Sequence, residues 1–208
     1  MGEKMYDEIE EFLDRNIKRV RNLSSVYDSS KTKGKGRKSV QDTDVLRAAV
    51  VMLHASLENF LRGLIKLRLP NSNESALNSI PLAGSEKNGR PEKFYLGSLV
   101  KHKGKSVELL LQESVYEYLE QISFNDTTEI ISRLNTIGVH YCDDELNVLK
   151  SIDSMIKRRH NIVHQADSNK ETRPGSYHAV AINKQMVEEW IKNTESFSKK
   201  ILELVQTN

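Results

Sequence analysis

The longest apolar stretch of the chain, from Leu46 to Leu69, constrains the fold more than any other segment. Its apolar residues cover more than one face of a helix and Pro70 ends it, so the stretch predicts a buried central helix over residues 42–69. Asp42 or Thr43 is placed to cap the N-terminus of this helix. The stretch also carries ionisable side chains: Arg47, His54, Glu58, Arg62, Lys66 and Arg68. These groups favour the core of a protein over a membrane span.

Apolar residues at spacings of three and four predict further helices over residues 5–27, 105–122, 126–136, 143–166 and 184–205. Asp126 and Glu129 form a capping-box-like start, and Asn183 is placed to cap the last helix. The segments 28–41, 70–92 and 167–180 predict loops. No segment predicts a convincing strand. The pattern therefore indicates an all-α, antiparallel bundle of about five helices, folded as one domain over residues 1–208 with its core at about 40–205.

The charges of the chain nearly balance, with 31 basic and 29 acidic residues and a net charge of +2. That balance permits nucleic-acid binding only where basic residues cluster. In the basic loop 28–41, Lys35, Arg37 and Lys38 belong either to a solvated connector or to a contact for an RNA backbone. A single cysteine excludes an intrachain disulfide, and the charged N-terminus does not resemble a signal peptide, so we expect a cytoplasmic protein.

The helix predicted over residues 143–166 contains a cation that its pattern does not explain. On a helical wheel the apolar residues gather on one side, and Arg159 falls in the middle of that side. The helical neighbours of Arg159 are all apolar: Met155, Ile156, Ile162 and Val163. A guanidinium there is costly unless it is paired or reaches a polar site. Arg158, in contrast, is expected to point away from the apolar side as ordinary surface charge.

Polar residues gather on the adjoining edge of the same predicted helix. His160 and His164 are one turn apart, Asn161 lies beside them, and Lys157 joins the patch. Because a group of cations and histidines repels itself, the patch predicts a site that faces an anion.

Other interpretations of these residues stay open. The two histidines can be ordinary residues at the edge of the core, or they can be a metal-binding pair. A zinc protease needs Glu at the second position of His-Glu-x-x-His, where this chain has Asn161, and no third ligand is evident. Arg159 can pair with Glu58 in the core as its only role. Glu58 can equally be the i,i+4 partner of Arg62.

The segment Arg159-His-Asn-Ile-Val-His164 resembles the R-x4-6-H motif of the HEPN superfamily, and Gln165-Ala-Asp167 extends the likeness. The helix from Leu46 to Arg62 and the closing helix around Trp190 are similar to those of the RiboL-PSP-HEPN branch, so the resemblance covers residues 40–205. Members paired with nucleotidyltransferase antitoxins have a tyrosine two residues after the motif histidine. This chain has Ala166 there, so the resemblance does not imply regulation through that tyrosine.

The resemblance implies a homodimeric helical bundle and, in many members, metal-independent cleavage of RNA, often in toxin–antitoxin or antiphage systems. Arg159 is expected to stabilise the phosphate, and His164 to act as general acid or base, without a cofactor or metal. Two copies are expected to complete the site, because these side chains lie about 140° apart on one helix. The expected supporting residues are His160, Asn161 and Glu58, and the expected RNA contacts are Lys157, Arg158, Lys35, Arg37 and Lys38.

The expected partners are RNA, a second copy of the chain, and a cognate antitoxin or defence-system protein, with no membrane. Two other functions fit the same pattern. A catalytically silent HEPN module would bind RNA, a nucleotide or a partner protein without cleaving it. A helical structural protein without a ligand would leave Arg159 unexplained.

Overall fold

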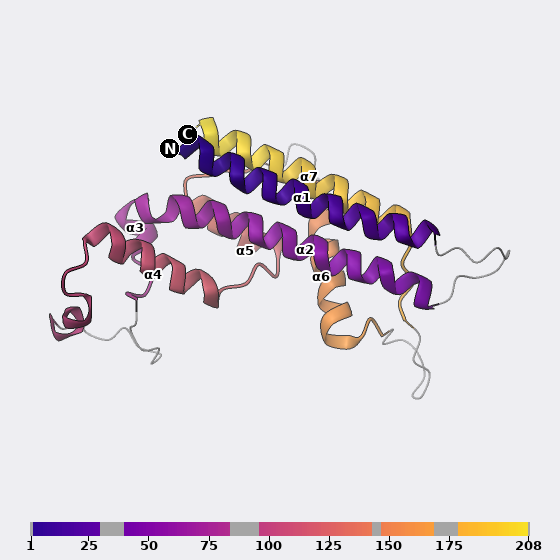
Figure 1. The fold of residues 1–208 in the computed structure, drawn as a ribbon, viewed down its shortest axis with the longest axis horizontal. Helices are drawn as coiled ribbons and strands as arrows, with labels where there is room; N and C mark the ends of the chain where they lie inside the picture. The colour runs from indigo at the N-terminus through magenta and orange to yellow at the C-terminus, as the bar shows by residue number, and fades with distance from the viewer. Residues whose placement is uncertain (1, 30–39, 84–95, 143–146, 169–178, 208) are drawn as a thin grey trace.

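Helix α2 (Val40–Arg68) is the central element of the fold, and the other long helices pack around it (Figure 1). The structure, a computed structural model, describes residues 2–29, 40–83, 96–142, 147–168 and 179–207. The other α-helices are α1 (Gly2–Ser29), α3 (Glu74–Leu77), α4 (Val107–Gln121), α5 (Thr127–Thr136), α6 (Val148–Gln165) and α7 (Lys184–Thr207). Two 3₁₀ helices, η1 (Leu69–Asn71) and η2 (Leu96–His102), complete the helical elements of the described residues.

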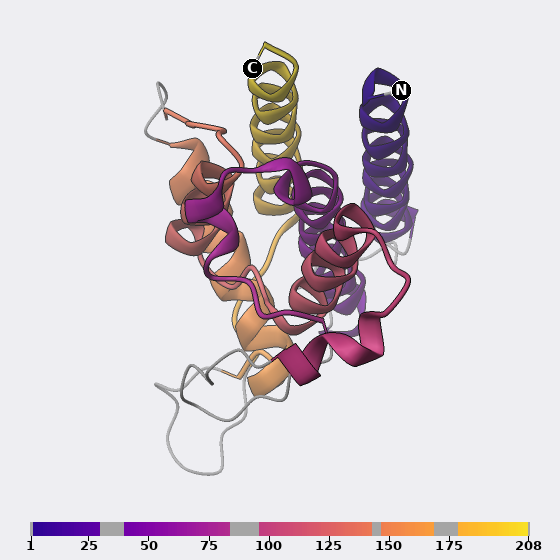
Figure 2. The same ribbon diagram turned by 90° about the vertical axis from the view of Figure 1, so that its left-hand side faces the viewer.

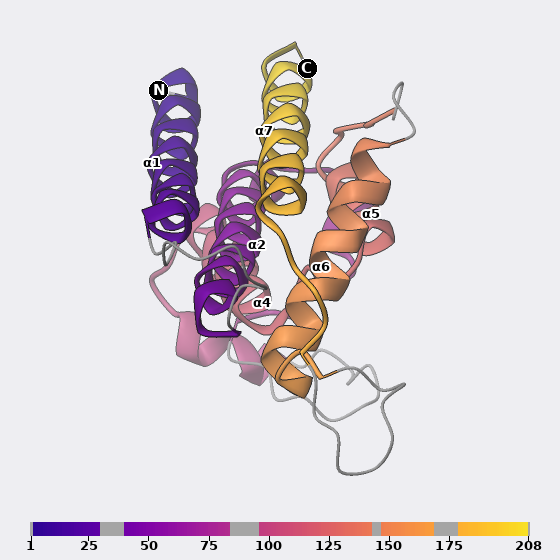
Figure 3. The same ribbon diagram turned by 90° about the vertical axis from the view of Figure 1, so that its right-hand side faces the viewer.

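The long helices α1 and α7 run antiparallel to each other and cover one side of α2 (Figure 2). Helices α4 and α6 pack on its other side (Figure 3). The C-terminal turns of α6 lead away from the layer formed by α1 and α7 (Figures 1 and 3). As a result, the end of α6 that carries the histidines lies at the margin of the bundle.

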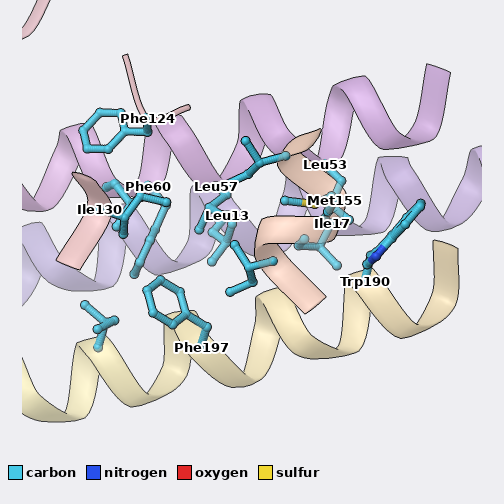
Figure 4. Packing of buried hydrophobic residues seen from close by; sticks show 14 of the residues in the cluster. Leu13, Ile17, Leu53, Leu57, Phe60, Phe124, Ile130, Met155, Trp190 and Phe197 are labelled. Carbon is cyan, nitrogen blue, oxygen red and sulfur yellow. The ribbon is translucent and has the colours of Figure 1, made fainter. Parts of the chain in front are cut away.

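The hydrophobic core forms where α2 meets its neighbours (Figure 4). Leu53, Leu57 and Phe60 of α2 are each almost fully buried, as are Ile17 of α1 and Phe197 of α7. Burial of one such side chain stabilises a fold by about 1.5–3 kcal/mol. Because these residues come from distant parts of the sequence, their packing holds the helices together as one core.

The segment Asp42–Asn71, which contains most of α2, is long and apolar enough to cross a membrane by length and composition alone. Within it, however, Leu46, Leu53 and Leu61 are fully covered by the rest of the protein. Coverage of this kind is the pattern of a core helix, as the charges of the stretch predict.

The all-α class is confirmed, and most predicted helices lie close to their predicted bounds. The Oδ1 atom of Asp126 accepts a hydrogen bond from the Glu129 N–H at 2.7 Å, and Asn183 caps α7 in the same way through the Met186 N–H at 2.9 Å. The expected cap at Asp42 or Thr43 is wrong, because α2 begins earlier, at Val40.

The described residues contain seven α-helices, six of which lie in the ranges that the sequence predicts as helical. The seventh, α3, is a single turn that the sequence did not predict. Helix α3, η1 and η2 are too short to give a recognisable apolar period. No strand occurs in the described residues, where Ser168 and Ala179 form one isolated antiparallel bridge.

His54 of α2 is buried in the core with only 2% of its surface exposed. Its Nε2 atom lies 3.2 Å from the carbonyl oxygen of Phe124. Burial lowers the pKa of His54, and the nearby charge of Arg159 acts in the same direction, whereas Phe124 and Glu58 oppose them. The folded protein therefore favours the neutral imidazole.

This burial predicts a pH-dependent stability. The unfolded chain binds a proton at His54 at higher pH than the folded chain does. The contribution of His54 to the free energy of unfolding is therefore complete above about pH 6.5, and it is lost as the pH falls below that value. The free energy of unfolding of wild type should fall between pH 7 and pH 5 by more than that of His54→Gln. Each unit of pKa difference corresponds to about 1.4 kcal/mol.

The measurement is denaturant unfolding at a series of pH values. His140→Gln is the matched control, since His140 is exposed and bonded only to Asn135 among the described residues. The control should keep the wild-type pH slope. If the free energy of unfolding changed with pH equally in His54→Gln and in wild type, the pH dependence would not come from His54.

Candidate functional site

The C-terminal end of α6 is closed by two residues in the left-handed region. Ala166 has a φ of 48° and Asp167 a φ of 56°, which are unusual values for residues other than glycine. The backbone N–H groups of both residues donate to the carbonyl oxygen of Asn161, Asp167 at 3.0 Å. The chain thereby turns sharply one residue after the helix, directly beyond His164.

Arg158 is not the ordinary surface charge that the helical wheel predicts. Its side chain is only 10% exposed, and its Nη2 donates to Oδ2 of Asp167 at 2.8 Å. The same nitrogen donates to the carbonyl oxygen of Val180 at 2.8 Å. The wheel was misleading because the chain folds back after α6 and covers the side of the helix that carries Arg158.

A second arginine binds the same carboxylate. Nε of Arg47, from the first turns of α2, donates to Oδ2 of Asp167 at 2.6 Å, and its Nη2 donates to Val180 at 2.9 Å. Asp167 itself is 1% exposed. We call Arg47, Asp167 and Arg158 the Arg–Asp–Arg cluster.

The cluster holds two guanidinium groups against one buried carboxylate. Burial lowers the pKa of Arg158, and the charge of Arg47 does so as well, whereas Asp167 raises it. Asp44 adds a partial counter-charge, since its Oδ1 lies 3.2 Å from Nη1 of Arg47, but Asp44 is exposed. Asp167 is therefore the one carboxylate among the described residues that joins α2 to the end of α6.

Arg159 has a different environment from its neighbour Arg158. The described residues provide no ion pair or hydrogen bond to its guanidinium, and its Nε atom is buried without a partner. Its charge lowers the pKa of His54, a buried residue of α2, so the guanidinium lies within electrostatic range of α2. Arg159 is thus a part-buried cation with unused donors.

Glu58 does not neutralise Arg159. The structure pairs Oε1 of Glu58 with Nη2 of Arg62 at 2.8 Å, which is the i,i+4 alternative that the sequence left open. The Oε2 atom of Glu58 lies 3.8 Å from Nδ1 of His54, and Arg62 also donates to the carbonyl oxygen of Ile122. Glu58 therefore belongs to a group that fixes the segment after α4 against α2.

His160 and His164 lie together on the exposed side of the last turns of α6. Their ring centroids are 4.6 Å apart, with an angle of 44° between the ring planes. Both residues are exposed, and the described residues offer no hydrogen bond to either ring. Asn161 is part-buried between this pair and the bundle. The imidazoles are thus accessible to a substrate or to another chain.

Val163 is exposed, contrary to its expected place on the buried side of the helix. Its exposed fraction is 48%, whereas Ile152, Met155 and Ile156 are buried. The apolar side of α6 continues to its C-terminus, but the helix leaves the bundle before it ends (Figure 3). An uncovered apolar side chain therefore sits beside His160 and His164.

The remaining candidates divide into two groups. Lys157 is exposed and pairs with Asp153 at 2.6 Å, one turn earlier on α6. Lys35, Arg37 and Lys38 lie outside the described residues. Among the residues that are described, no group of three or more His, Cys, Asp or Glu side chains is arranged to hold a metal ion.

Sequence reasoning missed Arg47 and Asp167. One signal for Arg47 was available, because it lies on the most apolar stretch of the chain, between Leu46 and Ala49, and a cation there needs a partner. Asp167 had the weaker signal of being the first carboxylate after a run of three basic residues, Lys157, Arg158 and Arg159. Neither signal identifies the other residue, because the pairing depends on how the helices fold together.

Comparison with known proteins identifies the family of the chain. The family model described as RiboL-PSP-HEPN matches residues 14–207. No curated protein and no solved structure matches the chain. The match begins inside α1, so the first helix, which the resemblance from sequence had left out, is part of the family domain. Because the match spans nearly the whole chain, this protein belongs to the RiboL-PSP-HEPN family.

Proposed function

We propose that this protein is a metal-independent endoribonuclease whose site forms between two copies of the chain. The family is one of ribonuclease or RNA-binding modules, which sets the class of function. The observation that carries the proposal is the state of Arg159, a part-buried arginine with no partner among the described residues, directly before His160, whose ring contacts that of His164.

The two proposed reactive side chains suit the chemistry of RNA cleavage. His164 takes the proton of a ribose 2′-OH, whose oxygen attacks the adjacent phosphorus. The bond from phosphorus to the 5′-oxygen breaks, and this oxygen receives the proton that His164 took. The products are a 2′,3′-cyclic phosphate and a 5′-hydroxyl. Arg159 stabilises the extra negative charge on the phosphate oxygens of the transition state.

One copy of α6 is a poor site by itself. Arg159 lies within electrostatic range of α2, whereas His164 is on the exposed side of the helix, about 140° around the helix axis. A second copy related by a two-fold axis brings a second Arg159 and a second His164 to the same cleft. The exposed Val163 between these residues provides an apolar contact for that copy.

Other residues have supporting roles in this proposal. His160 orients His164 through their ring contact, Asn161 supports the same turn, and Glu58 acts through the segment that it fixes. Lys157 is an exposed contact for the RNA backbone, as are Lys35, Arg37 and Lys38. We leave Arg158 out of the RNA contacts, because its guanidinium is engaged by Asp167. A role in a toxin–antitoxin or antiphage system, with a cognate partner, rests on the family alone.

A silent binding module is the second candidate. It is favoured by the exposure of His164, which has no hydrogen bond from the described residues to orient it as a base. Such a module would retain a labelled RNA in an equilibrium binding assay and leave it uncut over hours.

Replacement of the proposed base should abolish cleavage and leave the fold intact. We expect His164→Ala to reduce the cleavage rate of a mixed RNA pool by about 10²–10⁴-fold, because the proton transfer loses its acceptor. The circular dichroism spectrum and the dimer mass by light scattering should not change. His140→Ala, at an exposed histidine four residues after the end of α5, is the matched control and should cleave as wild type does. A fully active His164→Ala enzyme would rule out this role.

A composite site predicts complementation between two inactive variants. Arg159→Gln and His164→Ala chains, each inactive alone, should regain up to about half of the wild-type cleavage rate in each mixed dimer, because the shared cleft then holds one intact arginine and one intact histidine from different copies. The measurement is the cleavage rate after the two variants are unfolded together and refolded. Absence of any recovery, with mixed dimers shown by native mass spectrometry, would place both residues of a site on one copy.

Cleavage should not depend on a divalent metal, because the proposed proton transfer and charge stabilisation use only side chains. The rate in excess EDTA should equal that in buffer, and RNA with a 2′-deoxy group at the cleaved position should resist. Loss of activity with EDTA and its return with Zn²⁺ would instead support the metal-pair interpretation of the two histidines.

A further inference from the structure

The turn that carries His164 has little to hold it besides the residues that follow it. The ring of His164 contacts that of His160 and has no hydrogen bond from the described residues, and both histidines are exposed. Val163 next to it is also exposed. The last turn of a helix frays readily, because its carbonyl groups lack partners within the helix. A reacting group on such a turn needs a separate support.

The structure provides this support through a single residue, Asp167. Its backbone N–H donates to the carbonyl oxygen of Asn161 and so closes the last turn of α6. Its carboxylate accepts from Arg158, two and a half turns back on the same helix, at 2.8 Å. The same oxygen accepts from Arg47 at 2.6 Å and so ties this turn to α2, the helix within electrostatic range of Arg159.

The Arg–Asp–Arg cluster also holds the segment around Val180, which precedes α7. The carbonyl oxygen of Val180 accepts from both Arg47 and Arg158, and the Val180 N–H donates to the carbonyl oxygen of Asp167 at 2.9 Å. The end of α6, the start of α2 and the segment before α7 therefore meet at one buried carboxylate.

We propose that Asp167 is a positioning residue, which fixes the turn carrying His164 relative to α2 and to Arg159 through the Arg–Asp–Arg cluster. The inference rests on the proposed function for its catalytic consequence, but the placement of the turn can be measured without any activity. Without the carboxylate, two guanidinium groups face each other in a buried space and repel, so the end of α6 separates from α2.

Two substitutions separate this role from a general loss of stability. Asp167→Asn keeps the size of the side chain and a residue type that tolerates the left-handed backbone, and it removes only the charge. Arg47→Met removes the tie to α2 and leaves Arg158 and Asp167 as a neutral pair, so it folds even if Asp167→Asn does not. Asp44→Asn is the matched control, because Asp44 also contacts Arg47, at 3.2 Å, but it is exposed and does not reach α6.

The first readout is hydrogen exchange by mass spectrometry, together with the NMR signals of the His160 and His164 rings. In Asp167→Asn and Arg47→Met, amides of residues 160–166 should exchange about tenfold faster or more, and the ring signals should shift. Amides in the middle of α7 should keep the wild-type rates. Asp44→Asn should match wild type throughout. Wild-type exchange and ring signals in both test variants would overturn the proposal.

The second readout is RNA cleavage by the folded variants. A displaced base should lower kcat by about tenfold or more, with KM within about twofold, because RNA contacts elsewhere are kept. An unchanged kcat in a variant whose turn exchanges faster would overturn the positioning role. If wild type does not cleave RNA at all, the proposed nuclease fails, and the exchange and ring signals alone still decide whether Asp167 holds this turn.

Discussion

Enclosure of α2 by its neighbours is the constraint on which the rest of the structure depends. A helix that is covered on several sides must find partners for every polar side chain that it carries. Arg47, His54 and Arg62 lie along one side of α2, seven and eight residues apart, and each one binds a segment that has no regular structure. Arg47 binds the chain beyond α6, while His54 and Arg62 bind carbonyl oxygens of the segment between α4 and α5. These polar side chains of α2 thereby fix the positions of the segment around Val180 and of the segment between α4 and α5.

Two adjacent arginines on α6 differ in whether the fold supplies a partner for their charge. Arg158 and Arg159 differ by about 100° around the helix axis. Both keep a buried Nε without a partner in the described residues, but the Nη2 atom of Arg158 is bound by Asp167 and Val180, whereas the guanidinium of Arg159 has no ion pair or hydrogen bond there. A buried, unpaired cation lowers the stability of a fold, and such a cost persists most readily where a ligand or another chain uses the charge.

The sequence was sufficient where the determining interactions are local. Helical periods, the caps at Asp126 and Asn183 and the pair of Glu58 with Arg62 all involve residues within a few positions of each other. The Arg–Asp–Arg cluster could not be predicted, because Arg47 and Asp167 are 120 residues apart. The exposure of Val163 was missed for a related reason: the apolar pattern of one helix does not tell where its neighbours stop covering it. Arg159 was singled out by the helical wheel and His164 by its place in the polar patch, the family motif gave both their roles, and those roles stay predictions.

The N-terminal end of α1 and the C-terminal end of α7 lie at the same end of the layer that these helices form, and the last turn of α6 lies on the other side of the molecule (Figures 1 and 3). Any further domain joined to either end would start from the same corner of the molecule, and it would leave the His160–His164 surface unobstructed. The architecture thus separates the place where this protein can be tethered from the place where it would meet RNA.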